Sequence, residues 1–146
     1  MTEKEAWKHI KKIEDFYMHD RIQRIENLTA DGMPDMNGCI DGKEFWLELK
    51  CPRIPKRKDT ALFGSNHKIM PNQFAWMKKQ TLAGGKCGVL ICMDNYTIFV
   101  NGNTIDSSIL KMNIDEIKFG KFNVFFMPQS IKDSWLYIRE YIKMYL

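Results

Sequence analysis

The stretch Gly32–Lys50, GMPDMNGCIDGKEFWLELK, decides the fold that we predict for this chain. Asp41-Gly42 lies between two apolar-rich runs, which favours a two-residue hairpin turn whose central residues both have φ > 0. That turn sets a register in which Asp35 lies directly opposite Glu48. Residues so placed have Cβ atoms roughly 4.5–5.5 Å apart and point to one face. The stretch therefore predicts two carboxylates that share one divalent cation.

The alternation of side chains along the second strand of this hairpin predicts which face is functional. Lys50 lies two residues beyond Glu48 and points to the same face, as does Trp46, which either packs beneath the site or stacks on a base. The opposite face carries Phe45, Leu47 and Leu49 and is predicted to be core. A bulge at Gly38 would shift this register by one residue.

The composition predicts one soluble globular domain over residues 1–146, since 45% of the residues are hydrophobic and 27% are charged. No apolar run is long enough to span a membrane, and the charged N-terminus lacks the apolar core of a signal peptide. We therefore expect a cytoplasmic protein. The four cysteines include no Cys-x-x-Cys pair, which favours free thiols over a zinc knuckle.

The positive charge of the chain is concentrated in one segment. The formal net charge is +4, and residues 51–68 hold five basic side chains against the single acid Asp59. A basic cluster beside a carboxylate site is typical of proteins that bind a polyanion such as DNA. For each side chain alone, a solvated surface position is the alternative. The five are Arg53, Lys56, Arg57, Lys58 and Lys68.

The remaining patterns predict an α/β fold with a mixed sheet flanked by helices. Thr2 and Glu5 form the pattern of a capping box for a first helix, and Pro71 suits the first turn of a second. In the helices, Leu82 and Tyr145 are placed on inward faces. The expected helices are 2–18, 71–83, a short one near 107–112, and one after Ser130; the expected strands are 21–27, the hairpin 35–50, 87–93, 96–100 and 122–127.

Gly32-x-Pro34-Asp35 followed by Glu48-x-Lys50 resembles the core motif of the PD-(D/E)XK nuclease superfamily, the fold of many restriction enzymes and archaeal Holliday junction resolvases. Gln73 and Trp76 in the next helix are similar to its VRR-NUC and resolvase-like branch, of which small phage-encoded members carry the sequence found here at residues 24–27, Arg-Ile-Glu-Asn. The resemblance covers about residues 7–100 and leaves the C-terminal strand and helix, about 122–145, outside it. It implies a restriction-endonuclease-like sheet, and host cytoplasm if the chain is phage-encoded.

The resemblance also implies roles for individual residues. Asp35 and Glu48 would ligate Mg²⁺, replaceable by Mn²⁺, with help from the Leu49 main-chain carbonyl. Lys50 would lie beside the attacking water. Gln73 would hold the water and lysine or a phosphate, unless it is an ordinary polar helix residue. An upstream acid would complete the site, and we favour Glu26 over the alternatives in the first helix, which are Glu3, Glu5 and Glu14.

Together these features predict a divalent-metal-dependent DNA endonuclease that hydrolyses phosphodiester bonds. A structure-specific enzyme is one version, a Holliday junction resolvase-like homodimer acting on branched DNA. Its nucleic-acid contacts would come from the basic segment and from His67. The alternative is a catalytically inactive nuclease-fold protein that binds DNA or a partner. Intact Asp35, Glu48 and Lys50 favour the enzyme.

Overall fold

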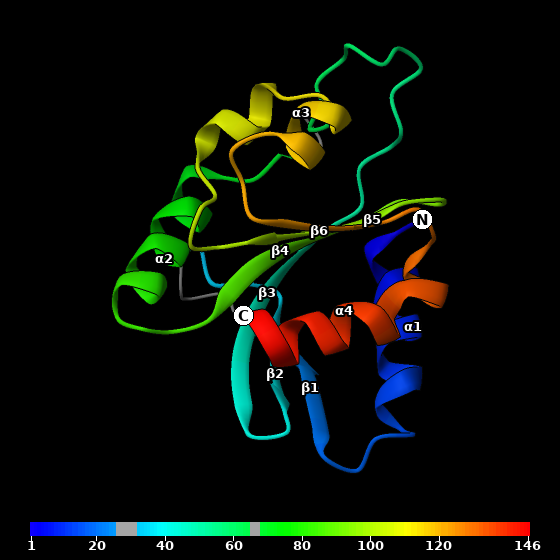
Figure 1. The fold of residues 1–146 in the computed structure, drawn as a ribbon, viewed down its shortest axis with the longest axis vertical. Helices are drawn as coiled ribbons and strands as arrows, with labels where there is room; N and C mark the ends of the chain where they lie inside the picture. Colours follow the sequence, from blue (N-terminus) through cyan, green and yellow to red (C-terminus); the bar gives the residue numbers. More distant parts are fainter. Residues whose placement is uncertain (26–31, 65–67) are drawn as a thin grey trace.

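The computed structural model describes residues 1–25, 32–64 and 68–146. Within these residues six strands form one sheet in the order β1-β2-β3-β4-β5-β6 (Figure 1). Strands β3 and β4 are parallel and all other neighbours are antiparallel, so the sheet is mixed, as predicted. The bounds are β1 Asp20–Arg24, β2 Met36–Ile40, β3 Lys43–Lys50, β4 Cys87–Cys92, β5 Thr97–Asn101 and β6 Val124–Met127.

Helices cover both faces of the sheet, which gives the predicted α/β layers (Figure 1). On one face lie α1 (Glu3–Glu14) and α4 (Ile131–Tyr145), packed on a core that includes Phe45, Leu47 and Leu49. On the other face lie α2 (Pro71–Leu82), the 3₁₀ helix η1 (Ser107–Lys111) and α3 (Ile114–Phe119). They pack on a second core that includes Val89 and Ile91.

The hairpin of β2 and β3 has the predicted register. Asp41 and Gly42 have φ of 47° and 83°, which is the conformation of a two-residue hairpin turn. Ile40 lies opposite Lys43 and Met36 opposite Leu47, with Gly38 paired to Phe45 and no bulge between them. The side chains of β3 therefore alternate as expected, and Phe45, Leu47 and Leu49 are buried against α1 and α4.

Strand β4 sets the position of the candidate site. All six of its residues are buried, because β4 lies between β3 and β5 and is covered on both faces. Lys50 at the end of parallel β3 pairs with Ile91 near the end of β4. The carboxyl ends of β3 and β4 thus meet at one edge of the sheet, which we call the carboxyl edge.

The capping box of α1 is present, but the helix is shorter than predicted. Thr2 and Glu5 bond to each other's backbone N–H groups. The helix ends at Glu14 instead of near Met18, because the next turn tightens and the Glu14 carboxylate accepts the Ile22 N–H at 2.7 Å. This bond ties the end of α1 to β1, and β1 accordingly starts at Asp20, one residue earlier than predicted.

Two side chains predicted to point inward are exposed. Leu82 is 78% exposed because it ends α2, where the chain turns at Gly84 (φ 87°), and Tyr145 is 65% exposed at the last turn of α4. The rest of the α4 stripe is buried as predicted, with Trp135, Ile138 and Ile142 in the core. Helix α3 was not predicted from the sequence.

The cysteine side chains lie in or near the core. All four cysteines are free thiols, of which Cys39 is half-buried and the other three are buried. In the described parts of the chain, no helix is both long and apolar enough to cross a membrane.

Candidate active site

Strand β3 presents two charged side chains on the face that α2 covers. Lys50 Nζ lies 3.0 Å from Glu48 Oε1, and Gln73 Nε2 of α2 donates to the same oxygen at 2.6 Å. The Glu48 side chain is 3% exposed and that of Lys50 is 13% exposed. A carboxylate this deeply buried needs partners for both oxygens. The second oxygen of Glu48, Oε2, is buried without a hydrogen-bond donor from residues 1–25, 32–64 or 68–146.

The surroundings of Glu48 raise its pKa to about 7. Burial is the largest cause and repulsion from the Asp35 carboxylate is the next, while Lys50 and Gln73 lower the pKa in part. A carboxyl group held at this pKa exchanges its proton near neutral pH. Its charged form would be favoured by any cation that approached the unpaired Oε2, because a nearby positive charge lowers a carboxyl pKa.

Asp35 lies in a bend just before β2, one residue outside the last pair of the ladder, Met36 and Leu47. Its carboxylate Oδ2 accepts the Leu49 N–H at 3.0 Å, and its carbonyl accepts the Ile25 N–H at 2.6 Å. We predicted that the chain re-enters the sheet at Asp35, and this was wrong by one residue, since pairing starts at Met36. The side chain of Asp35 instead takes a hydrogen bond from the β3 backbone.

Pro34 explains why the ladder stops there. In this register the next hydrogen-bonded pair beyond Met36 and Leu47 would be Pro34 and Leu49. Proline has no N–H, so it cannot donate to the Leu49 carbonyl. The Leu49 N–H therefore donates to the Asp35 carboxylate, and Pro34 offers no backbone N–H to the Leu49 carbonyl.

Gly32 allows this segment to lie against the first turn of α2. Its φ is 83°, and a Cβ atom at this position would lie 2.2 Å from the Asn72 carbonyl oxygen. Any side chain here would therefore push Asp35 away from the start of α2. The sequence singled out this glycine, but only the structure shows that its neighbour is the helix that carries Gln73.

Gln73 is fixed at both ends of its amide. Its Oε1 accepts the Met70 N–H at 2.8 Å and its Nε2 donates to Glu48. The amide is therefore held against Glu48 and is not free in solvent. Trp46, on the same face of β3, packs edge-to-face on Trp76 of α2 with ring centroids 5.6 Å apart. Of the two roles considered for Trp46, the structure shows the packing role.

The upstream acids in the described residues have partners of their own in α1 and β1. Glu5 is engaged in the capping box of α1 and Glu14 in its contacts with Ile22 and Lys11. Glu3 lies 4.0 Å from Arg24 at the end of β1. Glu26 lies outside the described residues. Within the described ranges, no three His, Cys, Asp or Glu side chains are close enough together to hold a metal ion between them.

The oxygen atoms near Glu48 fit a hard divalent cation. They are the unpaired Oε2 of Glu48, the Asp35 carboxylate and the Leu49 carbonyl that Pro34 cannot pair. Mg²⁺ prefers oxygen ligands, is held in many sites by one or two carboxylates, and keeps several waters. A set of two carboxylates and one carbonyl therefore matches its chemistry without a third acid.

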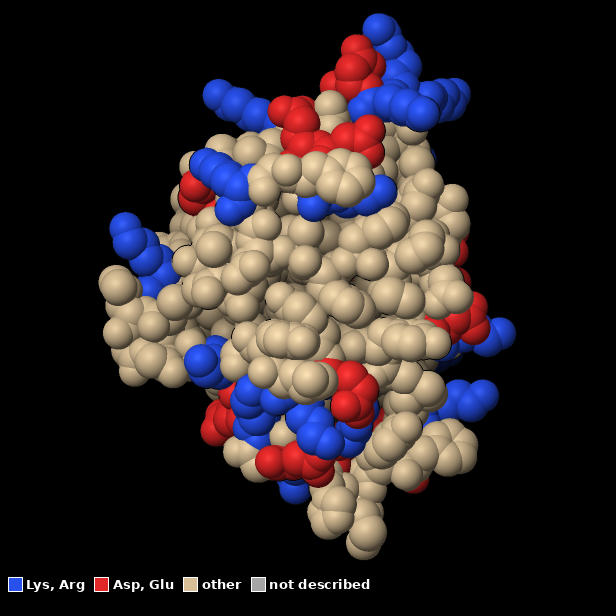
Figure 2. Space-filling view, in the orientation of Figure 1, with Lys and Arg blue, Asp and Glu red and all other residues tan. Residues whose placement is uncertain are grey.

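The basic segment leaves the carboxyl edge directly after Lys50. Its base is anchored by buried Pro52, Leu62 and Phe63, and Leu62 N–H donates to the Met112 carbonyl at 3.0 Å. The chain between these anchors forms the loop at the top of Figure 1, and Figure 2 shows basic side chains gathered there with a few acids. The predicted contacts Arg53, Lys56, Arg57, Lys58 and Lys68 are exposed, and His67 lies outside the described residues.

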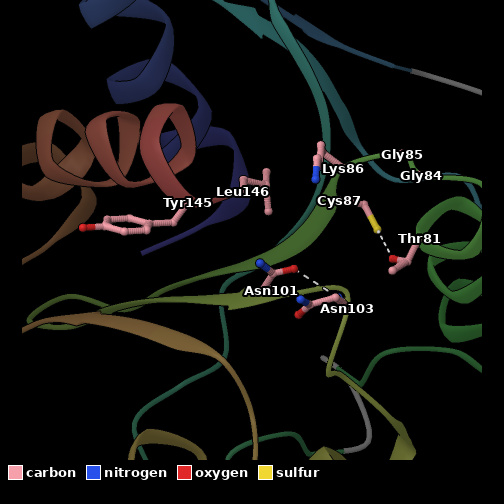
Figure 3. A pocket seen from close by; sticks show the side chains of 9 residues that line it. All are labelled: Thr81, Gly84, Gly85, Lys86, Cys87, Asn101, Asn103, Tyr145 and Leu146. Atoms are coloured by element: carbon pink, nitrogen blue, oxygen red, sulfur yellow. Dashed lines mark hydrogen bonds between the residues drawn. The ribbon is translucent and has the colours of Figure 1, made fainter.

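A pocket of about 210 Å³ lies at the opposite edge of the sheet, at the amino end of β4 (Figure 3). It contains the Cys87 thiol, which is within 3.6 Å of the Thr81 hydroxyl, and burial raises the pKa of this thiol. A thiol that stays protonated is a poor nucleophile. Neither Asp35 nor Glu48 lines this pocket, so it is separate from the candidate site.

Comparison with known proteins gives one kind of match. No protein-family model and no curated protein sequence matches the chain. Among solved structures, the chain is similar to that of Hjc, a Holliday junction resolvase from the archaeal hyperthermophile Archaeoglobus fulgidus. The TM-score is 0.43 at 14% identity, over 75% of this chain and 95% of that chain. A likeness this distant leaves the function to be argued from the residues of the site.

Proposed function

We propose that the chain is a divalent-metal-dependent endonuclease that hydrolyses phosphodiester bonds in DNA. One observation carries the proposal. Glu48 is buried at the carboxyl edge with one oxygen shared by Lys50 and Gln73 and with the other lacking a donor in the described residues. A purely structural ion pair would have both oxygens satisfied, so this arrangement suits a carboxylate that binds something further.

The proposed mechanism divides the work among the residues of the chain. Asp35, Glu48 and the Leu49 carbonyl would hold Mg²⁺ or Mn²⁺, which supplies Lewis acidity toward water and phosphate when it is bound. Lys50 would donate to a phosphate oxygen and stabilise the negative charge that develops there. Gln73 fixes the orientation of Glu48, and the basic segment attracts the DNA backbone.

The test is a cleavage panel with purified protein in Mg²⁺, in Mn²⁺ and in EDTA. The substrates are plasmid, linear duplex, flap, single-stranded and four-way-junction DNA. We expect cleavage that requires the metal and that is lost in Asp35→Asn. Asp133→Asn is the matched control, because Asp133 is an exposed carboxylate on α4, on the other face of the sheet. Equal cleavage by Asp35→Asn and wild type would refute the site.

The finer version of the proposal is a structure-specific enzyme of the Holliday junction resolvase type, in the VRR-NUC branch. It is motivated by the motif resemblance at Gly32–Lys50, Gln73 and Trp76. Resolution of a four-way junction needs two symmetric cuts and hence two sites, so this version predicts a homodimer. Preference for the junction in the panel, with a dimer by light scattering in the presence of DNA, would support it; a monomer that cuts all substrates equally contradicts it.

The second candidate is a nuclease-fold protein that binds DNA or a partner without turnover. The exposed basic segment is compatible with binding alone. This candidate predicts DNA binding of unchanged affinity in Asp35→Asn and no metal-dependent cleavage of any substrate by wild type.

A further inference from the structure

The basic segment closes a second pocket against α3, away from Glu48. This pocket has a volume of about 340 Å³ and is lined by residues from three parts of the chain. They are the loop between Ile54 and Thr60, Tyr96 in the turn between β4 and β5, and the α3 residues Ile114, Asp115 and Lys118. The four basic side chains in the lining, Lys56, Arg57, Lys58 and Lys118, face a single acid, Asp115.

The pocket lies at the same edge of the sheet as the candidate active site. Lys50 pairs with Ile91, and one residue farther along β4 Cys92 pairs with Thr97, which directly follows Tyr96. Neighbouring strands are about 4.8 Å apart. The loop that begins after Lys50 also contributes one wall of the pocket. A nucleic-acid strand bound at Glu48 that continues along the carboxyl edge therefore reaches Tyr96.

Lys118 is held in this pocket by aromatic rings. Its Nζ lies 3.8 Å from the ring centroid of Phe126 and 5.0 Å from that of Phe119. No carboxylate in the described residues lies within 4.0 Å of it, whereas the nearby Lys121 pairs with Asp106 at 2.9 Å. Lys118 is half-buried, so its ammonium group is positioned and without an anion. A phosphate group would supply that anion.

Tyr96 supplies the second kind of contact. Its ring packs on Phe126 with centroids 5.4 Å apart and a tilt of 38°, and it lines the pocket beside the lysines. An aromatic ring next to a positively charged groove is the usual arrangement for single-stranded nucleic acid, because every base has a face that can stack. In a duplex these faces are already stacked on neighbouring bases. The volume is near the lower end of ligand pockets, roughly 300–1,000 Å³, and suits one nucleotide.

We propose that the pocket formed by Tyr96, Lys118 and the loop 54–60 binds one unpaired nucleotide of single-stranded DNA, its base on Tyr96 and its phosphate on Lys118. This assignment rests on the proposed function, which identifies the ligand as DNA. It implies that the substrate cleaved at Glu48 is DNA with unpaired nucleotides beside the cut. Tyr96 and Lys118 were not singled out in the sequence, where no local pattern connects them to the basic segment.

The test measures binding in EDTA, so that it does not depend on cleavage. Fluorescence anisotropy compares labelled oligothymidine with a blunt duplex of the same length. We expect oligothymidine to bind more tightly than the duplex. Tyr96→Leu should weaken its binding about 10-fold because the base loses its stacking partner. Lys118→Gln should weaken it by a similar factor, about 10-fold, because the phosphate loses a charged hydrogen-bond donor. Tyr96→Phe keeps the ring and should bind as wild type. Lys132→Gln, an equal loss of charge at an exposed position of α4, is the matched control.

A second readout locates the base. An oligothymidine with 5-iodouracil in place of thymine should cross-link under ultraviolet light to the peptide that contains Tyr96, and thermal unfolding checks that each variant is folded. The proposal is overturned if Lys118→Gln and Tyr96→Leu both bind oligothymidine as tightly as wild type does. It is also overturned if the blunt duplex binds as tightly as oligothymidine and the two variants weaken both equally. If both variants weaken binding but wild type cleaves no substrate, the proposed nuclease activity is refuted and the nucleotide pocket is supported. If wild type cleaves DNA but neither variant weakens binding, the pocket is refuted and the nuclease activity is supported.

Discussion

Two buried carboxylates lie on opposite faces of the sheet, and each is paired with a cation in a different way. Asp20 of β1 faces Arg139 of α4, whose Nε and Nη2 donate to its two oxygens at 2.5 and 2.7 Å. The guanidinium also stacks on Tyr17, 4.1 Å from the ring centroid. Glu48 instead has two donors on one oxygen and none from the described residues on the other.

The difference separates a structural ion pair from a candidate functional one. The Asp20–Arg139 pair is bidentate and complete, which is the geometry in which a buried ion pair offsets its desolvation cost. The Glu48–Lys50 pair is incomplete, and burial and the nearby Asp35 raise the pKa of Glu48 to about 7. The Glu48 carboxylate, at the carboxyl edge of the sheet, can therefore still bind a ligand through Oε2.

The largest effect is expected from Asp20→Ala. This change removes the bidentate partner of the buried Arg139 guanidinium and leaves it only the more exposed Glu140 carboxylate, 2.7 Å from Nη1. The unfolding free energy should fall by about 3–4 kcal/mol, the lower part of the range for breaking a buried ion pair. Chemical denaturation measures the loss. Cleavage per folded molecule should stay at the wild-type level, because Asp20 lies on the face opposite Glu48. A change in cleavage that exceeds the loss of folded protein would contradict the division between the two pairs.

Lys50→Ala tests the other pair. We expect cleavage to fall by about 10²–10³-fold, the usual cost of removing one group that stabilises transition-state charge. The unfolding free energy should change by about 1 kcal/mol or less, because Glu48 can take up a proton when its cation is removed. Single-turnover cleavage and denaturation are measured on the same preparation, with Lys132→Ala as the control. A stability loss as large as that of Asp20→Ala would make the pair structural.

The raised pKa of Glu48 predicts a pH dependence of stability. Between its ordinary pKa of 4.5 and its folded value of about 7, the folded state binds more protons than the unfolded state. The contribution of Glu48 to stability is therefore full below pH 4.5 and is lost as the pH rises through 7, on the order of 3 kcal/mol.

This pH dependence is measured as a difference between wild type and Glu48→Gln in urea denaturation from pH 4.5 to 8 with EDTA. The variant cannot titrate at this position, so the difference isolates Glu48. Mg²⁺ should restore part of the lost stability of wild type at pH 8, because binding to the folded state alone stabilises it. A pH-independent difference would mean that Glu48 stays ionised throughout.

The smallest effect is expected from Gly32→Ala, with Gly42→Ala as its matched control. Both glycines have φ of 83°, so both substitutions strain the backbone by roughly 1–2 kcal/mol. Only at Gly32 does the new Cβ meet another atom, the Asn72 carbonyl oxygen at 2.2 Å. We therefore expect cleavage to fall about 10-fold in Gly32→Ala alone, by displacement of Asp35 from Gln73, a modest value for misplacement within a site.

Equal cleavage by the two glycine variants would show that the contact between Gly32 and α2 does not position the site. Circular dichroism distinguishes this outcome from partial unfolding. A loss of cleavage in Gly32→Ala alone would instead connect Gly32 to the position of Asp35 and to the Glu48–Lys50 pair, and would leave the Asp20–Arg139 pair on the other face unaffected.

The sequence predicted the hairpin well because its information is local. The Asp41-Gly42 turn and the alternation of β3 are fixed by neighbours a few residues apart, and the register followed from them. Helix α3 was missed and the C-terminal end of α1 was misplaced, since such features depend on contacts like that of Glu14 with Ile22. The prediction that Leu82 and Tyr145 point inward was wrong for the same reason. Helical spacing predicts which side chains form an apolar face, but packing against other elements decides how much of that face is buried.

The sequence by itself determined the register of the hairpin and which side chains of β3 share a face, because a two-residue turn and a period of two leave one register. It also determined where the excess positive charge begins. Only the tertiary structure decided that Gln73 reaches Glu48, that Glu48 Oε2 has no donor in the described chain, and that Tyr96 and Lys118 meet the basic segment. These are contacts between distant segments, set by how helices cover a sheet, and no spacing along the chain encodes them.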